Sequence, residues 1–270
     1  MRNTTPAKTM QQLVCAAGLV LMAAESSAQS TATNPAATSA QACAAHGKSQ
    51  APSQVLSAQQ QAILPIAAFA AAGDMERLTP SLQAGLEAGL SISDIREVLV
   101  QLYAYAGFPR SLNALNAFMQ LLQQREKLGI VDAAGCPPSR AIAQGDALRA
   151  AGRANQTQLA GAPVQGPLFD FAPAIGEYLQ SHLFGAIFER DNLDWHSREL
   201  ATVGMLSALP GAESQLQSHM RISLNAGLSA AQLQQAVQVL DSRVGSANGQ
   251  RASTALANTL AALASQKRKR

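Results

Sequence analysis

Two residues whose side chains can exchange protons, Glu199 and His219, flank a predicted turn at Gly211. Glu199 lies 12 residues before this glycine and His219 lies 8 residues after it. In an antiparallel helical hairpin they would lie about 18 and 12 Å from the turn, at about 1.5 Å per residue. A carboxylate beside an imidazole forms an acid/base couple. The alternative is that Glu199 only adds charge near a helix start and His219 is a hydrogen-bonded interior group.

Other patterns for chemistry are missing from the sequence. The four histidines, His46, His182, His196 and His219, form neither H-x-x-x-H nor H-E-x-x-H, so we predict no metal site. The sequence also lacks G-x-S-x-G, G-x-G-x-x-G and the phosphate-binding loop. We therefore expect a protein that works without a cofactor.

The segments that must position these residues occur in two copies. Residues 73–91 recur as residues 211–229 with a constant offset of 138, and an Ala-Gly-Leu-Ser run closes both segments. Each copy predicts a helix, a tight turn, a helix, a Gly-Leu-Ser turn and a further helix. Ser91 and Ser229 are the predicted N-caps of these last helices, with Asp94 and Gln232 three residues later.

Composition favours an all-α fold built from this tandem repeat. Hydrophobic residues make up 47% of the 270 residues, charged residues 14% and aromatic residues 4%, which excludes a disordered chain and disfavours a large sheet. The net charge is +3, and Lys267–Arg270 carry four positive charges, so a nucleic-acid-binding body is not expected. We predict these segments: 1–28 signal peptide, 29–54 disordered leader, 55–128 first unit, 129–166 linker, 167–262 second unit and 263–270 basic tail.

The N-terminus has the pattern of a secretory signal peptide. Arg2 and Lys8 precede an apolar run of twelve residues at 13–24, and small residues follow up to Ala28. Twelve residues are too few to span a bilayer, which takes about 20. We expect export to the periplasm or secretion, with Gln29 as the new N-terminus and no membrane attachment after cleavage. The alternative is an amphipathic segment of a cytosolic protein.

Two cysteines, Cys43 and Cys136, remain after this cleavage. In an oxidising compartment they are expected to form a disulfide that joins the leader to the mid-chain loop. A redox-active pair and two free thiols are the alternatives.

The second copy resembles the carboxymuconolactone decarboxylase family in residues 198–202, 216–219 and 224–228, and the first copy resembles it in residues 97–99, 103–109 and 111–115. The resemblance covers about residues 56–125 and 167–257. It implies an all-α fold that assembles into trimers or hexamers. Because this chain resembles two fused units, it implies a homotrimer that imitates a hexamer.

The resemblance also implies an activity and a set of site residues. The decarboxylase branch removes carbon dioxide from an unsaturated lactone, and Arg198 and His219 match its positions for a carboxylate-binding cation and a proton-transfer group. Glu199 joins His219 as the third predicted catalytic residue. The predicted substrate-binding residues are Tyr105, Arg110, Trp195 and His196; for Trp195 the alternative is plain packing at the start of a helix.

The peroxidase branch of the family uses a C-x-x-C pair before the histidine, and this sequence has Ala212 and Gln215 at those positions. We therefore expect an exported decarboxylase-like lyase that acts on a small organic acid or lactone. The alternatives are an alkylhydroperoxidase-type antioxidant protein that uses Cys43 and Cys136, and a non-catalytic binding scaffold.

The two copies have diverged in complementary ways. The first keeps Tyr105 but has Ser81 where the second has His219, and the second has Arg243 where the first has the Tyr-Ala-Gly-Phe-Pro stretch. One composite site per chain, or one across a subunit contact, is expected.

Overall fold

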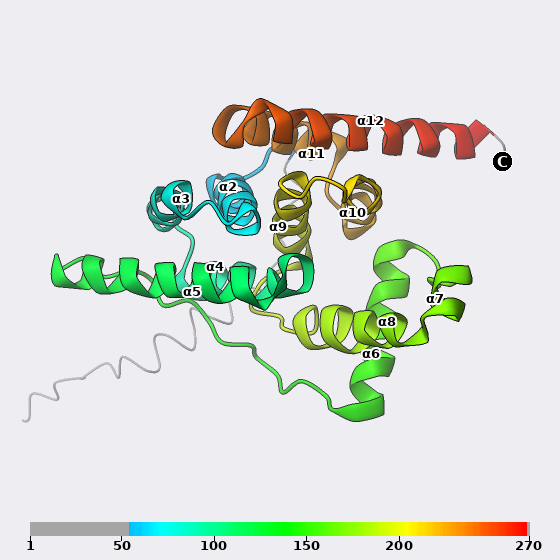
Figure 1. Cartoon of the computed structure of the whole chain (residues 1–270), viewed down its shortest axis with the longest axis horizontal. Coiled ribbons are helices and arrows are strands. Elements are labelled where there is room, and N and C mark those ends of the chain that lie inside the picture. The colour runs from blue at the N-terminus through cyan, green and yellow to red at the C-terminus, as the bar shows by residue number, and fades with distance from the viewer. Residues whose placement is uncertain (1–53, 269–270) are drawn as a thin grey trace, which may run out of the picture. The chain divides into compact units, whose positions relative to one another are not determined.

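The structure, a computed structural model, describes residues 54–268. The predicted signal peptide, most of the leader and Cys43 lie outside these residues. Between residues 54 and 268 the chain is helical and contains no strand, as the sequence predicted. Figure 1 shows these helices in chain order.

Each copy of the repeat forms the same succession of helices. Those of the first copy are α2 (Ala58–Ala72), α3 (Met75–Glu87), α4 (Ile92–Gln101) and α5 (Tyr103–Lys127). Those of the second copy are α9 (Trp195–Ser207), α10 (Glu213–Ala226), α11 (Ala230–Val239), the short π-helix η2 (Leu240–Val244) and α12 (Ser246–Arg268). The first residues of α10 and α11 follow those of α3 and α4 by 138 positions, so the sequence offset is also the structural one.

Glycines with positive φ close the turns of both copies. Gly73 and Gly211 have φ of 75° and 88° in the first turn, and Gly89 and Gly227 have φ of 92° and 112° in the second. A side chain is strained in this left-handed region, which explains why glycine occupies all four positions.

The helix that follows the second turn begins with a capping box in both copies. The Ser91 hydroxyl accepts a hydrogen bond from the backbone N–H of Asp94, and the Asp94 carboxylate accepts one from the backbone N–H of Ser91. Ser229 and Gln232 form the same reciprocal pair. The two predicted N-caps are confirmed, and each satisfies backbone donors that a helix start leaves open.

The two copies share one hydrophobic core. Helices α2 and α9 lie side by side within it (Figure 1), and buried residues of both copies belong to the same cluster. A Cβ atom at Gly204 would lie 2.8 Å from the carbonyl oxygen of Leu64 and 3.0 Å from the Cβ of Ala67. The glycine therefore permits close approach of α9 to α2, and the copies fold as one packed unit.

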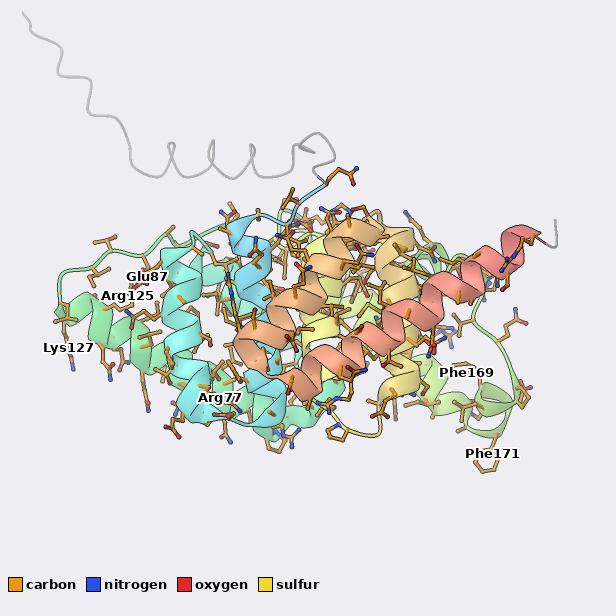
Figure 2. All side chains as sticks on the ribbon, turned by 90° about the horizontal axis from the view of Figure 1, so that it is seen from above. Arg77, Glu87, Arg125, Lys127, Phe169 and Phe171 are labelled. Atoms are coloured by element: carbon orange, nitrogen blue, oxygen red, sulfur yellow. The ribbon has the colours of Figure 1, made fainter. Side chains whose placement is uncertain are left out.

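The predicted linker, residues 129–166, contains a well-packed helix. Helix α6 (Gly145–Ala160) packs on the π-helix η1 (Leu179–Ile187), and Leu159 is buried beside Phe184 and Phe188. These apolar contacts explain why the segment is helical. Two short helices, α7 (Pro167–Phe171) and α8 (Pro173–Tyr178), precede η1, and Figure 2 shows the exposed Phe171 projecting from α7.

The expected basic tail is largely helical, because α12 runs through it as far as Arg268. Within residues 54–268, no helix is both long and apolar enough to cross a membrane.

Candidate functional site

The structure brings Glu199 and His219 together. Glu199 lies in the second turn of α9, and His219 lies in the middle of α10, the antiparallel partner of α9 across the turn at Gly211. The Nδ1 atom of His219 lies 2.8 Å from Oε2 of Glu199. The Glu199 side chain is fully buried and that of His219 is 10% exposed. A buried carboxylate therefore holds the imidazole of His219. The imidazole contacts solvent only through the small part of its side chain that remains exposed.

Tyr105 adds a side chain from the first copy to this pair. Its ring meets the imidazole of His219 edge-on, with ring centroids 5.7 Å apart. The Tyr105 hydroxyl and Oε1 of Glu199 are both buried and have no hydrogen-bond partner. Burial, followed by the negative charge of Glu199, raises the pKa of Tyr105, so the phenol keeps its proton at neutral pH. One chain thus contributes all three groups of a composite site.

A backbone break directly after Tyr105 directs this side chain. Gly107 has φ of 81° and ψ of 161°, which interrupts the helical conformation inside α5. Pro109 follows the break near the start of the next helical stretch, where its missing N–H has no cost. The Ser111 hydroxyl donates to the backbone carbonyl of Leu99 at 2.7 Å and fixes that stretch against α4. The Gly-Phe-Pro sequence therefore orients Tyr105 independently of the long helix after it.

Arg198, the predicted carboxylate-binding cation, makes its hydrogen bonds with groups other than the Glu199–His219 pair. Its side chain is fully buried, and its Nη2 atom donates to Oε2 of Glu97 at 3.1 Å and to the backbone carbonyl of Arg190 at 2.8 Å. Adjacent helical residues point about 100° apart, so with Glu199 facing His219 the guanidinium faces another side of α9. Arg198 is an interior partner of Glu97.

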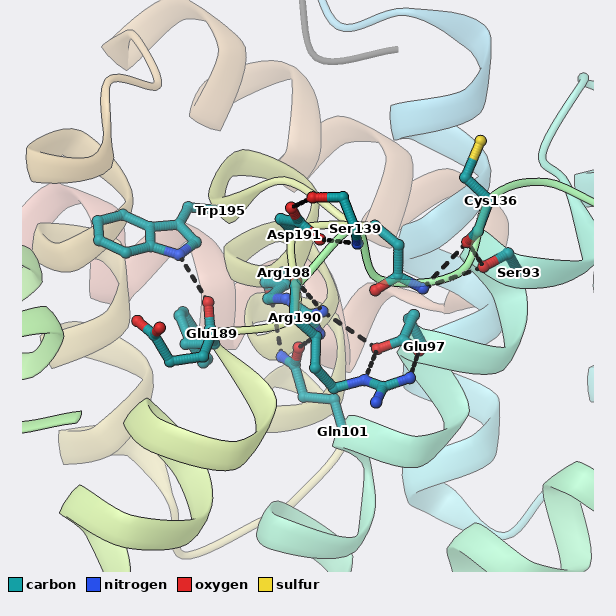
Figure 3. Close-up of polar contacts among 12 residues, drawn as sticks. Ser93, Glu97, Gln101, Cys136, Ser139, Glu189, Arg190, Asp191, Trp195 and Arg198 are labelled. Carbon is teal, nitrogen blue, oxygen red and sulfur yellow. Dashed lines mark hydrogen bonds and ion pairs between the residues drawn. The ribbon is translucent and has the colours of Figure 1, made fainter. Parts of the chain in front are cut away.

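Glu97 is the centre of a buried charge network (Figure 3). Its carboxylate accepts two hydrogen bonds from Arg190, at 2.8 and 2.6 Å, besides that from Arg198. Burial alone would raise the pKa of Glu97, but the two guanidinium groups outweigh it and lower that pKa to about 2. The Gln101 amide donates to the carbonyl of Arg198 and to the Thr202 hydroxyl, which ties α4 to α9. The network locks the helix that presents Glu199.

Sequence reasoning missed the role of Glu97. A signal was present, because Glu97 stands between apolar residues of a helix whose neighbours Ile95, Val98 and Leu99 are buried. A carboxylate in such a position needs a cation. Nothing in the sequence, however, identified which of the 20 lysines and arginines supplied it.

The other predicted substrate-binding residues contact backbone carbonyls at or near the ends of helices. Arg110 donates to the backbone carbonyl of Ala71 near the end of α2. The indole N–H of Trp195 donates to the carbonyl of Phe188 at 3.2 Å, and the two rings pack together. The Nε2 atom of His196 contacts the carbonyl oxygen of Ala226 at 2.8 Å, so this nitrogen carries the proton. These contacts favour the packing alternative for Trp195 and give Arg110 and His196 the same kind of role.

Cys136 is disulfide-bonded, and its predicted partner, Cys43, lies outside the described residues. The backbone carbonyl of Cys136 accepts a hydrogen bond of 2.6 Å from Ser93, which fixes the connecting loop at the start of α4. Among residues 54–268, no group of three or more His, Cys, Asp or Glu side chains is arranged to hold a metal ion.

In residues 54–268 the tandem helices bring the carboxylate of Glu199, the imidazole of His219 and the phenol of Tyr105 together. The sequence model of the carboxymuconolactone decarboxylase family matches residues 37–120 and 173–258, which is more than half of the chain. The chain belongs to this family, and the two matched regions correspond to the two copies of the repeat. No curated protein matches the chain significantly.

Proposed function

We propose that this protein is a carboxymuconolactone decarboxylase-like lyase that acts on a small organic acid or lactone by acid/base chemistry without a cofactor. The observation that supports this most is the buried contact of 2.8 Å between Glu199 and His219. The Tyr105 phenol, whose ring contacts the imidazole edge-on, adds a second group that can donate a proton. The imidazole and the phenol can both take part in proton transfer, while the carboxylate orients the imidazole.

The contact with Glu199 defines what each nitrogen of His219 does. The Nδ1–H group donates to the carboxylate, so Nε2 is the nitrogen that accepts and returns a proton. In decarboxylation, the bond between the carboxylate and the ring breaks, and its electron pair moves onto the conjugated lactone as a dienolate. Nε2 would take up one proton from water before the step; Tyr105 would donate a hydrogen bond to the dienolate oxygen, and protonated Nε2 would deliver that proton to carbon as carbon dioxide leaves. Because Arg198 is bound to Glu97, these two groups provide the charge stabilisation in this proposal.

The Tyr105→Phe variant should separate catalysis from stability. The buried Tyr105 hydroxyl has Thr202 as a polar neighbour but makes no hydrogen bond of normal geometry, so its removal should change the free energy of unfolding by no more than about 1 kcal/mol. If the hydroxyl stabilises the dienolate, kcat should fall about 10- to 100-fold. Urea unfolding and steady-state kinetics measure the two effects. An unchanged kcat would remove Tyr105 from the mechanism.

A thiol peroxidase is the competing function, and the double variant Cys43→Ser/Cys136→Ser tests it. Cys136 is disulfide-bonded, and Ala212 and Gln215 replace the thiols that would lie beside His219. We expect the double variant to keep its turnover of lactone carboxylates, measured as release of carbon dioxide. Consumption of organic hydroperoxides by the wild type with a thiol reductant, abolished in the double variant, would establish the peroxidase instead. A wild type inactive towards both substrate classes would favour a binding scaffold.

Export and assembly belong to the same proposal. Cleavage after Ala28 would place the enzyme in the periplasm or outside the cell. The side chains of Phe108, Leu112 and Met119 are all more than half exposed along α5, an apolar surface compatible with a trimer.

A further inference from the structure

The repeat places a pocket where the first copy would have the counterpart of the Glu199–His219 site. Glu199 and His219 correspond to Gln61 and Ser81 at the offset of 138, and Tyr105 corresponds to Arg243. Gln61, Ser81 and Arg243 line one pocket of about 430 Å³. The pocket is therefore the counterpart of the acid/base site. In each of the two, one copy of the repeat contributes two side chains and the other copy contributes the third.

A glycine break follows Arg243 at the same spacing as the break that follows Tyr105. Gly245 has φ of 150° and ψ of 154°, and it breaks the chain between η2 and α12 two residues after Arg243. Gly107 makes the corresponding break two residues after Tyr105. The two copies thus share the position of the glycine break, while the side chain two residues before it is a phenol in one copy and a guanidinium in the other.

The three polar groups of this pocket cannot reproduce the acid/base chemistry. The amide of Gln61 donates to the carbonyl of Leu56 at 3.0 Å, and the Ser81 hydroxyl donates to the carbonyl of Arg77 at 2.8 Å. Neither group exchanges protons near neutral pH, and the Arg243 guanidinium stays protonated. The pocket therefore has the groups for binding but none for proton transfer.

Arg243 is also free to receive an anion. The only hydrogen bond of its side chain among the described residues is a long one of 3.4 Å from Nη2 to Oε1 of Gln61, and no described carboxylate forms an ion pair with it. Alanine and proline side chains form most of the remaining wall, including Pro65, Pro80 and Ala84. A cation at the edge of an apolar wall suits a carboxylate with an apolar body.

We infer that this pocket is a second, non-catalytic site that binds a small organic monocarboxylate. Arg243 holds the carboxylate, and the alanine and proline wall holds the apolar part. The inference does not depend on the proposed reaction, since it uses none of the groups at Glu199 and His219.

Isothermal titration of the mature protein with benzoate tests this inference, with benzamide as the uncharged analogue of the same shape. We expect benzoate to bind at one equivalent per chain, about tenfold or more tightly than benzamide, because charge-assisted hydrogen bonds to the guanidinium are the stronger ones. Arg243→Gln should weaken benzoate binding about tenfold or more, and Ala84→Leu should block it by filling the pocket. Both positions are exposed, so the fold should tolerate the changes.

Two control variants locate the binding event. Arg96→Gln removes an exposed arginine of α4 outside the pocket and should leave the benzoate affinity unchanged. The His219→Asn variant, altered at the acid/base site, should also keep it. Absence of benzoate binding, equal binding of benzamide, an unaffected Arg243→Gln variant, or loss of binding in His219→Asn alone would each overturn the second site.

Discussion

The His219→Asn variant is expected to lose turnover by about 10²- to 10⁴-fold, the usual contribution of a general acid/base group. Its amide nitrogen takes the place of Nδ1 and can still donate to Glu199, but the variant has no group at the position of Nε2. Asparagine is a better replacement than alanine, because alanine would leave the fully buried Glu199 carboxylate without its partner. Steady-state kinetics on a lactone carboxylate gives the loss, and circular dichroism checks the fold.

The control for this variant is His182→Ala. His182 is exposed and contacts Tyr103 and Tyr178 rather than the acid/base pair, so its removal should leave kcat unchanged. A folded His219→Asn protein that keeps wild-type turnover would contradict the acid/base role of His219.

The Glu97→Gln variant is expected to lose about 3–5 kcal/mol of unfolding free energy, because it leaves the fully buried Arg198 without its carboxylate partner. Urea unfolding at pH 7 measures the loss. Glu126→Gln, an exposed change on α5, should stay within about 0.5 kcal/mol of the wild type. A Glu97→Gln protein as stable as that control would show that the network contributes nothing.

The network also predicts how stability depends on pH. The pKa of Glu97 falls from an ordinary 4.5 to about 2 in the folded protein. The unfolded chain therefore binds the proton first, and the stabilisation is complete above about pH 4.5 and is lost as the pH falls towards 2. At about 1.4 kcal/mol per pKa unit, the loss is on the order of 3 kcal/mol. In Glu97→Gln this part of the acid dependence should disappear.

The repeat made most of the helical framework predictable from sequence. The offset of 138, the turn glycines and the two capping boxes are local signals, and they placed α3, α4, α10 and α11 in matching positions. The same logic suggested that Glu199 and His219 could meet, because two helices joined by a tight turn at Gly211 must run antiparallel.

Long-range contacts explain what the sequence alone could not predict. Arg198 was expected to bind substrate, but it turns towards Glu97, which is 101 residues away in the chain. Helix α6 owes its packing to η1, whose contact residues follow it after two further helices. The correspondence of Gln61 with Glu199, in contrast, is predictable from sequence, because it has the same offset of 138 that links Ser81 with His219.

A crystal of the protein soaked with an unsaturated lactone carboxylate tests the central claim most directly. The proposed mechanism predicts the lactone beside His219, with polar atoms within hydrogen-bond distance of Nε2 and of the Tyr105 hydroxyl. A compound that the protein turns over but that binds away from His219, with Nε2 left without a ligand, would contradict the acid/base site.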